Sequence, residues 1–475
     1  MKTVFVSGNF NVIHPGHQRL LKFARGLGDK LIVGILPDKY IEGTSFIGEK
    51  LRLEGIQSIS FVDEAFILND SLQNTLKKLK PNIIVKGKEH ESKFNTELKV
   101  IQKYGGKLIF SSGDIVFSSV DILNKEFSKK LQTNFEIPQD YLDRHKIKLS
   151  RIREIIEKFN SLNVCVIGDL IIDEYIMCQP IGMSQEDPTL VVSPLDNKKF
   201  LGGAGIVAAH SSGLGAKTHL FSVIGNDKLS KLANKMTGLS GIYSSLLIDD
   251  SRPTTLKQKF RRNNQSLLKI NHVVNHSINK ELQKKILSKF KKISTKLDIL
   301  IFSDFNYGCL PKNLVSEITK IAKKNNIFMA ADSQSSSQIG DICKFQQMNI
   351  ITPTEHEART STNNYEDGLV VLSTELQKKS KAKNIFLKLG DEGLLIHNMK
   401  KGKNAFATDR ISALNSAPLD VSGAGDSLLI ASVLAIKSGG SIWEAGLIGS
   451  IAASIQVGRT GNVPLKLKQM LEFID

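Results

Sequence analysis

The chain has 475 residues, more than one hydrophobic core usually organises, so we expect two or three domains. Hydrophobic residues make up 41% and charged residues 23% of the sequence, which excludes an intrinsically disordered protein. The formal net charge is +17, and residues 257–296 carry twelve Lys or Arg against one acid, Glu281. Apolar residues at helical spacing among these lysines favour a solvated helix face over a nucleic-acid surface.

Two classes of protein are excluded by simple patterns. No apolar run is long enough to cross a bilayer, and the first residues alternate as a strand does, so we expect a cytoplasmic protein that binds no membrane. The four cysteines are widely separated in the sequence, which argues against a zinc knuckle or a disulfide framework.

Short apolar segments alternate with helical patterns through the first 124 residues. This alternation predicts a parallel, doubly wound sheet. Strands are expected at 3–6, 31–35, 82–85 and 107–110, with helices from His17 and near 96–104. The sequence then becomes polar, so we place a first domain at 1–135 and a linker at 136–150.

The segment GNFNVIHPGH at residues 8–17 joins the first expected strand to the first expected helix. It brings two imidazoles, His14 and His17, to the carboxyl edge of a sheet and to a helix N-terminus, where backbone N–H groups favour phosphate. Nucleotidyl transfer needs mainly such positioned donors, because a phosphate oxygen attacks the α-phosphate of a nucleotide and pyrophosphate leaves.

Two further motifs, PNIIVKG at 81–87 and FSSV at 117–120, follow in the same domain. With them, residues 8–124 resemble the adenylyltransferase domain of the bifunctional heptose kinase/adenylyltransferases, within the cytidylyltransferase-like superfamily. The resemblance implies that His14 and His17 stabilise the phosphates in the transition state and that Phe10 and Asn11 line the nucleotide pocket. It also implies that Lys86 binds the substrate phosphate and that Ser118 and Ser119 cap the triphosphate. The family usually has Asp where this chain has Asn11.

A second α/β pattern fills residues 151–475, which we expect to form an α/β/α domain. Strands are expected at 164–167, 219–223, 297–302, 327–331, 349–351 and 384–387. Two stretches, 174–192 and 254–271, break the alternation and predict hairpins that form a small β lid beside a site.

The segment LDVSGAGD at 419–426 precedes a strongly apolar helix pattern. Backbone amides at Gly423, Ala424 and Gly425 can close on an anion, and Asp426 in the first turn can take a proton from a nearby hydroxyl. A kinase needs this combination of a base and an anion hole for the transferring phosphoryl group.

The DxxGAGD pattern resembles the second signature of the PfkB or ribokinase family, and the likeness extends over about residues 162–464. It implies sugar contacts from Asp173, Gly202 and Gly203. On the nucleotide side it implies Lys388, Gly390, Gly393 and Glu357, with Mg²⁺ carried by the nucleotide and no direct protein ligand. Three positions depart from the family: Ile206 replaces an Asn that commonly touches the sugar, Thr354 replaces the Asn of an NxxE motif, and Lys388 replaces a Thr or Ser.

Together the resemblances imply a bifunctional enzyme that uses ATP and Mg²⁺. It would phosphorylate a heptose-like sugar phosphate at the anomeric carbon and then couple the product to a nucleotide, with the two domains in the reverse of the family's order. The expected partners are a sugar phosphate, a nucleoside triphosphate and a second copy of the chain, but not nucleic acid. Two alternatives stay open: a CTP-dependent cytidylyltransferase as the first domain, and a nucleic-acid-binding or regulatory protein on an enzyme scaffold.

Overall fold

The computed structural model describes residues 2–11, 13, 15–38, 47–87, 97–111, 137–262, 265–335, 338, 340–398 and 408–474. The chain divides into two compact units, Met1–Thr133 and Asn134–Asp475. Three residues predicted to bind phosphate, His14, Ser118 and Ser119, lie outside the described residues. None of the helices in the described ranges combines the length and hydrophobicity needed to span a bilayer.

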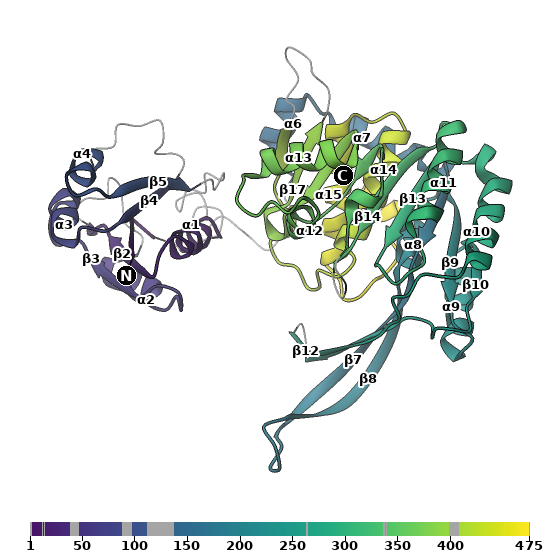
Figure 1. The fold of residues 1–475 in the computed structure, drawn as a ribbon, viewed down its shortest axis with the longest axis horizontal. Helices are drawn as coiled ribbons and strands as arrows, with labels where there is room; N and C mark the ends of the chain where they lie inside the picture. Colours follow the sequence, from purple (N-terminus) through teal and green to yellow (C-terminus); the bar gives the residue numbers. More distant parts are fainter. Residues whose placement is uncertain are drawn as a thin grey trace. The chain divides into compact units, whose positions relative to one another are not determined.

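Unit 1 is built on a parallel five-stranded sheet in the order β3-β2-β1-β4-β5, which confirms the predicted doubly wound domain (Figure 1). Helices α1 and α2 pack on one face of the sheet, and α3 and α4 pack on the other. The strands are β1 (Thr3–Gly8), β2 (Lys30–Ile35), β3 (Glu64–Ile67), β4 (Ile83–Gly87) and β5 (Lys107–Ser111). The helices are α1 (Pro15–Gly26), α2 (Glu49–Gln57), α3 (Leu72–Leu79) and α4 (Leu98–Ile101).

The strand order places β1 at a topological switch point. Its two neighbours are β2 and β4, which the chain reaches by going to opposite sides of β1. Ligands of open α/β sheets bind outside the carboxyl ends of the strands at such a point. The segment between β1 and α1, which carries the HxGH pattern, leaves the sheet there.

Unit 2 contains a nine-stranded sheet in the order β10-β9-β6-β13-β14-β15-β16-β17-β18, parallel except for the two pairings among β16, β17 and β18. The strands are β6 (Asn163–Gly168), β9 (Lys217–Ile224), β10 (Tyr243–Ile248), β13 (Ile299–Asp304), β14 (Phe328–Ser333), β15 (Ile350–Ile351), β16 (Asn384–Lys388), β17 (Leu394–Asn398) and β18 (Thr408–Ile411). The helices are α6 (Gln139–His145), α7 (Leu149–Glu157), α8 (Ala204–Gly213), α9 (Lys228–Leu239), α10 (Lys280–Ile293), α11 (Lys312–Lys324), α12 (Glu355–Thr362), α13 (Leu369–Ser380), α14 (Ala424–Lys437), α15 (Ile442–Val457) and α16 (Leu467–Glu472).

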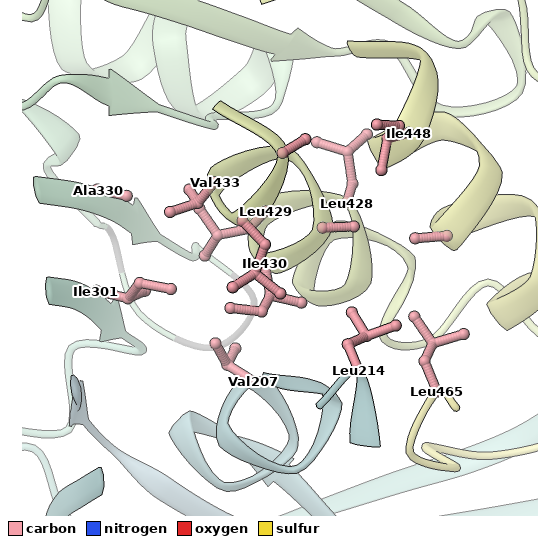
Figure 2. Packing of buried hydrophobic residues seen from close by; sticks show 14 of the residues in the cluster. Val207, Leu214, Ile301, Ala330, Leu428, Leu429, Ile430, Val433, Ile448 and Leu465 are labelled. Atoms are coloured by element: carbon pink, nitrogen blue, oxygen red, sulfur yellow. The ribbon is translucent and has the colours of Figure 1, made fainter. Parts of the chain in front are cut away.

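Two apolar cores, one on each face of the sheet, give unit 2 the predicted α/β/α layers. One core contains α7, α8, α14 and α15, and the other contains α10, α11, α12 and α13. Figure 2 shows Leu429, Ile430 and Val433 of α14 close to Ile301 of β13 and Ala330 of β14. Because α14 is apolar on nearly every side, it is buried as a central helix, and this fixes the position of its N-terminus.

The two predicted hairpin regions form a separate four-stranded sheet in the order β12-β11-β7-β8. Its strands are β7 (Leu170–Met183), β8 (Leu190–Gly203), β11 (Leu256–Arg262) and β12 (Gln265–His272). Figure 1 shows β7 and β8 running together well beyond the main sheet of unit 2. We call this four-stranded sheet the lid.

The expected linker at 136–150 is wrong, because residues 139–145 form α6 and pack on the body of unit 2. Tyr141 donates its hydroxyl to the backbone carbonyl of Trp443 at 2.9 Å, and the His145 ring stacks on the Trp443 ring with centroids 4.2 Å apart. Arg144 donates to Asp409 at 3.0 Å. In the sequence this segment resembles a linker because most of its residues are polar or charged. Its packing face is formed by the rings of Tyr141 and His145, which lie one helical turn apart.

Candidate functional site

The N-terminus of α14 is shaped by its glycines. Gly423, the N-cap residue, has φ +76°, a left-handed conformation that favours glycine. A Cβ atom on Gly423 would lie 2.5 Å from Oδ1 of Asn462, so a larger residue there would have to displace the Asn462 side chain. The backbone N–H groups of the first turn have no acceptor within the helix; that of Ala424 makes a long hydrogen bond of 3.4 Å to the carbonyl of Val421, which an anion can replace.

Asp426 lies in this first turn and is only 5% exposed. Burial, followed by the charge of Asp332, raises the pKa of Asp426 to about 7, while the ammonium groups of Lys388 and Lys257 act in the opposite direction. Its Oδ1 accepts a long hydrogen bond of 3.4 Å from Gln334. A carboxyl group with a pKa near neutrality is well matched to proton transfer at physiological pH.

Lys388, at the end of β16, places a buried ammonium group beside the same helix N-terminus. Its Nζ lies 2.9 Å from Oδ1 of Asp332, and a Cβ atom on Gly425 would lie 3.0 Å from that Nζ. Burial opposes the charge of Lys388, but Asp332, Glu357 and Asp426 together raise its pKa, so the side chain stays cationic. Gly390 and Gly393 follow in a turn in which both have positive φ.

Both carboxylate oxygens of Glu357 accept hydrogen bonds from backbone N–H groups. Its Oε2 accepts the backbone N–H of Thr354 at 2.7 Å, and its Oε1 accepts the backbone N–H of Ser335 at 3.0 Å. In return, the Thr354 hydroxyl accepts the N–H of Glu357 and completes a capping box at the start of α12. The Thr at 354 therefore keeps the cap that an Asn would provide.

The residues predicted to contact the sugar lie where the lid joins the main sheet. Asp173 on β7 is 7% exposed, and its Oδ2 accepts a hydrogen bond of 2.7 Å from Nδ2 of Asn462. A Cβ atom on Gly202 would lie 2.3 Å from that oxygen, and one on Gly203 would lie 2.2 Å from the carbonyl of Asp169. Burial raises the pKa of Asp173, against the opposing charges of the lid lysines Lys259 and Lys257.

The structure thus gathers most of the predicted kinase residues, since the charges of Asp173 and Lys388 both act on Asp426. Ile206 is different: it is fully buried in the apolar core, so an Asn there would be surrounded by hydrocarbon. Sequence reasoning missed Asn462, Asp332 and the basic residues of β11. For the basic residues of β11, the alternating pattern of Lys257, Lys259 and Arg261 is a signal that could have revealed them, because side chains two residues apart lie on the same face of a strand.

In unit 1 the loop after β1 brings Phe10 and His17 into contact. Phe10 is 2% exposed, has φ +48°, and its ring centroid lies 5.0 Å from that of His17. A non-glycine residue in this conformation is uncommon and is maintained only where its surroundings require it. Phe10 is therefore mainly a packing partner for the imidazole, while Asn11 is 7% exposed beside it.

Sequence reasoning also missed Arg52, the largest fully buried polar side chain near this loop. Its guanidinium donates to the backbone carbonyls of Asn9 and Leu36, which follow β1 and β2, and pairs with Asp38. Lys86 at the end of β4 lies 2.7 Å from Glu97, and both side chains are largely buried. Two buried cations therefore stand at the carboxyl edge of the unit 1 sheet.

Comparison with known proteins agrees with this geometry. The family model described as pfkB family carbohydrate kinase matches residues 161–467, and the model described as cytidylyltransferase-like matches residues 5–155. The bifunctional protein HldE of Desulfatibacillum aliphaticivorans is 30% identical over 324 residues, which are 67% of this chain and 64% of that protein. HldE of Aliarcobacter butzleri is 28% identical over 315 residues, which are 66% of this chain and 64% of that protein. The matches thus span less than two thirds of the length of these relatives.

Solved structures show the same fold for unit 2. Arabidopsis thaliana ribokinase, solved with ribose and ATP, has a TM-score of 0.52 at 19% identity and covers 66% of this chain and 98% of its own. Escherichia coli phosphofructokinase-2 has a TM-score of 0.55 at 14% identity, with the same coverage. Since the pfkB model spans well over half of the sequence and includes the glycine-rich helix N-terminus described above, the chain belongs to the pfkB family of carbohydrate kinases.

Proposed function

We propose that unit 2 transfers the γ-phosphoryl group of ATP to a hydroxyl of a sugar phosphate of the heptose class. The observation that carries this proposal is the buried carboxyl of Asp426, in the first turn of α14 and within the electrostatic influence of Asp173 and Lys388. Asp426 takes the proton of the sugar hydroxyl, the new O–P bond forms, and the bond to the β-phosphate oxygen breaks to release ADP.

The other residues stabilise charge during this step. The backbone N–H groups at the start of α14 donate to the phosphoryl oxygens, and Lys388 adds a fixed positive charge beside Gly425. Mg²⁺ supplies further neutralisation of the phosphates and arrives with the nucleotide. Asp173, oriented by Asn462, accepts a sugar hydroxyl hydrogen bond.

We propose that unit 1 then couples the sugar 1-phosphate to a nucleotide. A phosphate oxygen attacks the α-phosphorus, and pyrophosphate leaves. His17 of α1, supported by Phe10, contributes a donor to the phosphates, and Arg52 holds the start of the loop that carries Phe10. ATP is the proposed nucleotide because the bifunctional heptose enzymes, which residues 8–124 resemble, are adenylyltransferases.

Separate products allow each half to be tested alone. Purified chain is incubated with Mg²⁺, ATP and a panel of sugar phosphates, and ADP and pyrophosphate are measured separately. Asp426→Asn should abolish ADP formation but leave pyrophosphate release from supplied sugar 1-phosphate intact, and His17→Gln should do the reverse. Release of neither product would defeat the proposal, and pyrophosphate from CTP in place of ATP would assign unit 1 as a cytidylyltransferase.

A further inference from the structure

The loop that leads into α14 is organised by one carboxylate, Asp420. Its Oδ1 accepts the backbone N–H of Ser422 at 3.1 Å and the Ser422 hydroxyl at 2.8 Å, and its Oδ2 accepts the N–H of Gly461 at 3.0 Å. Burial opposes the ionisation of Asp420, but these hydrogen bonds hold its pKa at about 2. Asp420 is therefore an anion throughout the working pH range, and it fixes the backbone directly before Gly423.

The lid reaches this loop with two cations from β11. Arg261 donates from Nη1 to Oδ2 of Asp420 at 2.8 Å, and the two side chains are 3% and 8% exposed. Lys259 donates to the Ser422 hydroxyl at 2.7 Å and to the Tyr175 hydroxyl at 3.0 Å. The pairing of β11 with β12 shifts register between Phe260 and Arg261, and such a bulge commonly re-aims a side chain.

The same lid sheet carries the sugar-side carboxylate. Asp173 on β7 pairs in register with Lys257 on β11, four residues before Arg261. Any movement of this sheet would therefore carry the guanidinium of Arg261 with it. If the lid withdraws, Asp420 is left as a buried anion without its cationic partner, which is strongly unfavourable.

We propose that Arg261 is a positioning residue that couples the lid to the phosphate loop of the kinase site. It acts through Asp420: with β11 in place, the carboxylate is neutralised and the loop before α14 keeps the shape that presents the helix amides to the phosphoryl group. This inference rests on the kinase activity proposed above for unit 2.

The test compares Arg261→Met with Arg262→Met in the full chain. Arg262 is the next residue of the same strand and is exposed, so it controls for the loss of one positive charge from the lid. With ATP and a heptose 7-phosphate, Arg261→Met should lower kcat at least tenfold and change the KM for the sugar less than threefold, because Asp173 is untouched. Arg261→Lys should restore part of kcat, and Arg262→Met should match the wild type.

A double variant separates the coupling from a general loss of stability. Because the two residues act as a pair, Asp420→Asn combined with Arg261→Met should be no worse in kcat than the poorer single variant. Amide hydrogen exchange at 419–423, measured without ligand, should be faster in Arg261→Lys than in Arg262→Met, and this readout does not require activity. Equal kcat for Arg261→Met and Arg262→Met, or equal exchange in this loop, would overturn the inference, whereas an inactive wild type would defeat the proposed kinase function instead.

Discussion

Replacing Asp426 with Asn removes the proposed base and also removes a buried negative charge, so activity and stability should change in opposite directions. Burial, followed by Asp332, raises the pKa of Asp426 to about 7 from an ordinary value of 3.8, a shift of about 3 units. At about 1.4 kcal/mol per unit, this corresponds to at most about 4 kcal/mol of folding free energy. The favourable contribution of the neutral carboxyl is complete below pH 3.8 and is lost as the pH rises to about 7.

The variant should therefore be more stable than the wild type, by up to about 4 kcal/mol at pH 8.5 and by about 2 kcal/mol at pH 5.5. Its kcat for phosphoryl transfer should fall by roughly 100- to 10,000-fold. Urea unfolding can be followed through Trp443, the only tryptophan of the chain, which reports on unit 2 alone.

Asp420→Asn is the matched control, because hydrogen bonds outweigh burial and hold the pKa of Asp420 at about 2. A lowered pKa stabilises the fold above the ordinary value, so this variant should be less stable than the wild type at both pH values. An Asp426→Asn protein that keeps more than a tenth of kcat, or that is no more stable than the wild type at pH 8.5, would refute the reasoning.

Three further outcomes follow from the described contacts. Lys388→Met should move the acidic limb of the kcat/KM profile to higher pH, because Lys388 holds down the pKa of Asp426; an unshifted limb would contradict this role. Asn462→Leu should raise the KM for the sugar roughly tenfold or more, because Asp173 loses a hydrogen bond and such a bond to a charged group is worth about 1.5–3 kcal/mol. Kinetics with Asn462→Gln would show whether the amide itself is needed. Arg52→Met should abolish pyrophosphate release while leaving ADP formation unchanged, and a variant that keeps both activities would exclude Arg52 as the support of the loop after β1.

The parts of the fold that sequence reasoning predicted are those set by local chemistry. The apolar helix after Gly423 needs only residues within one or two turns, and it forms as its pattern predicts. The alternation of strands and helices likewise predicted the main sheets of both units, and the two stretches that break it predicted the hairpins of the lid. Elements with weak periodicity, such as β3 and β10, were not predicted.

The missed parts of the site depend on contacts across the chain. Asn462 reaches Asp173 over 289 residues, and Arg261 reaches Asp420 over 159. Neither pairing leaves a periodic trace, because it exists only after β11 has paired with β7 and α14 is buried in the core. Ile206 is a related case. Its departure from the family pattern suggested the loss of a sugar contact, but the side chain packs in the apolar core.

The packing of α6 decides where the polypeptide can be cut. A kinase fragment that starts at residue 151, as polarity along the sequence suggested, would lack the helix whose His145 ring covers Trp443 and whose Arg144 pairs with Asp409. Such a fragment would expose an indole face to solvent and should aggregate more readily than one that starts at Asn134. Dividing this enzyme for separate expression therefore requires keeping a short helix that the charge pattern alone would discard.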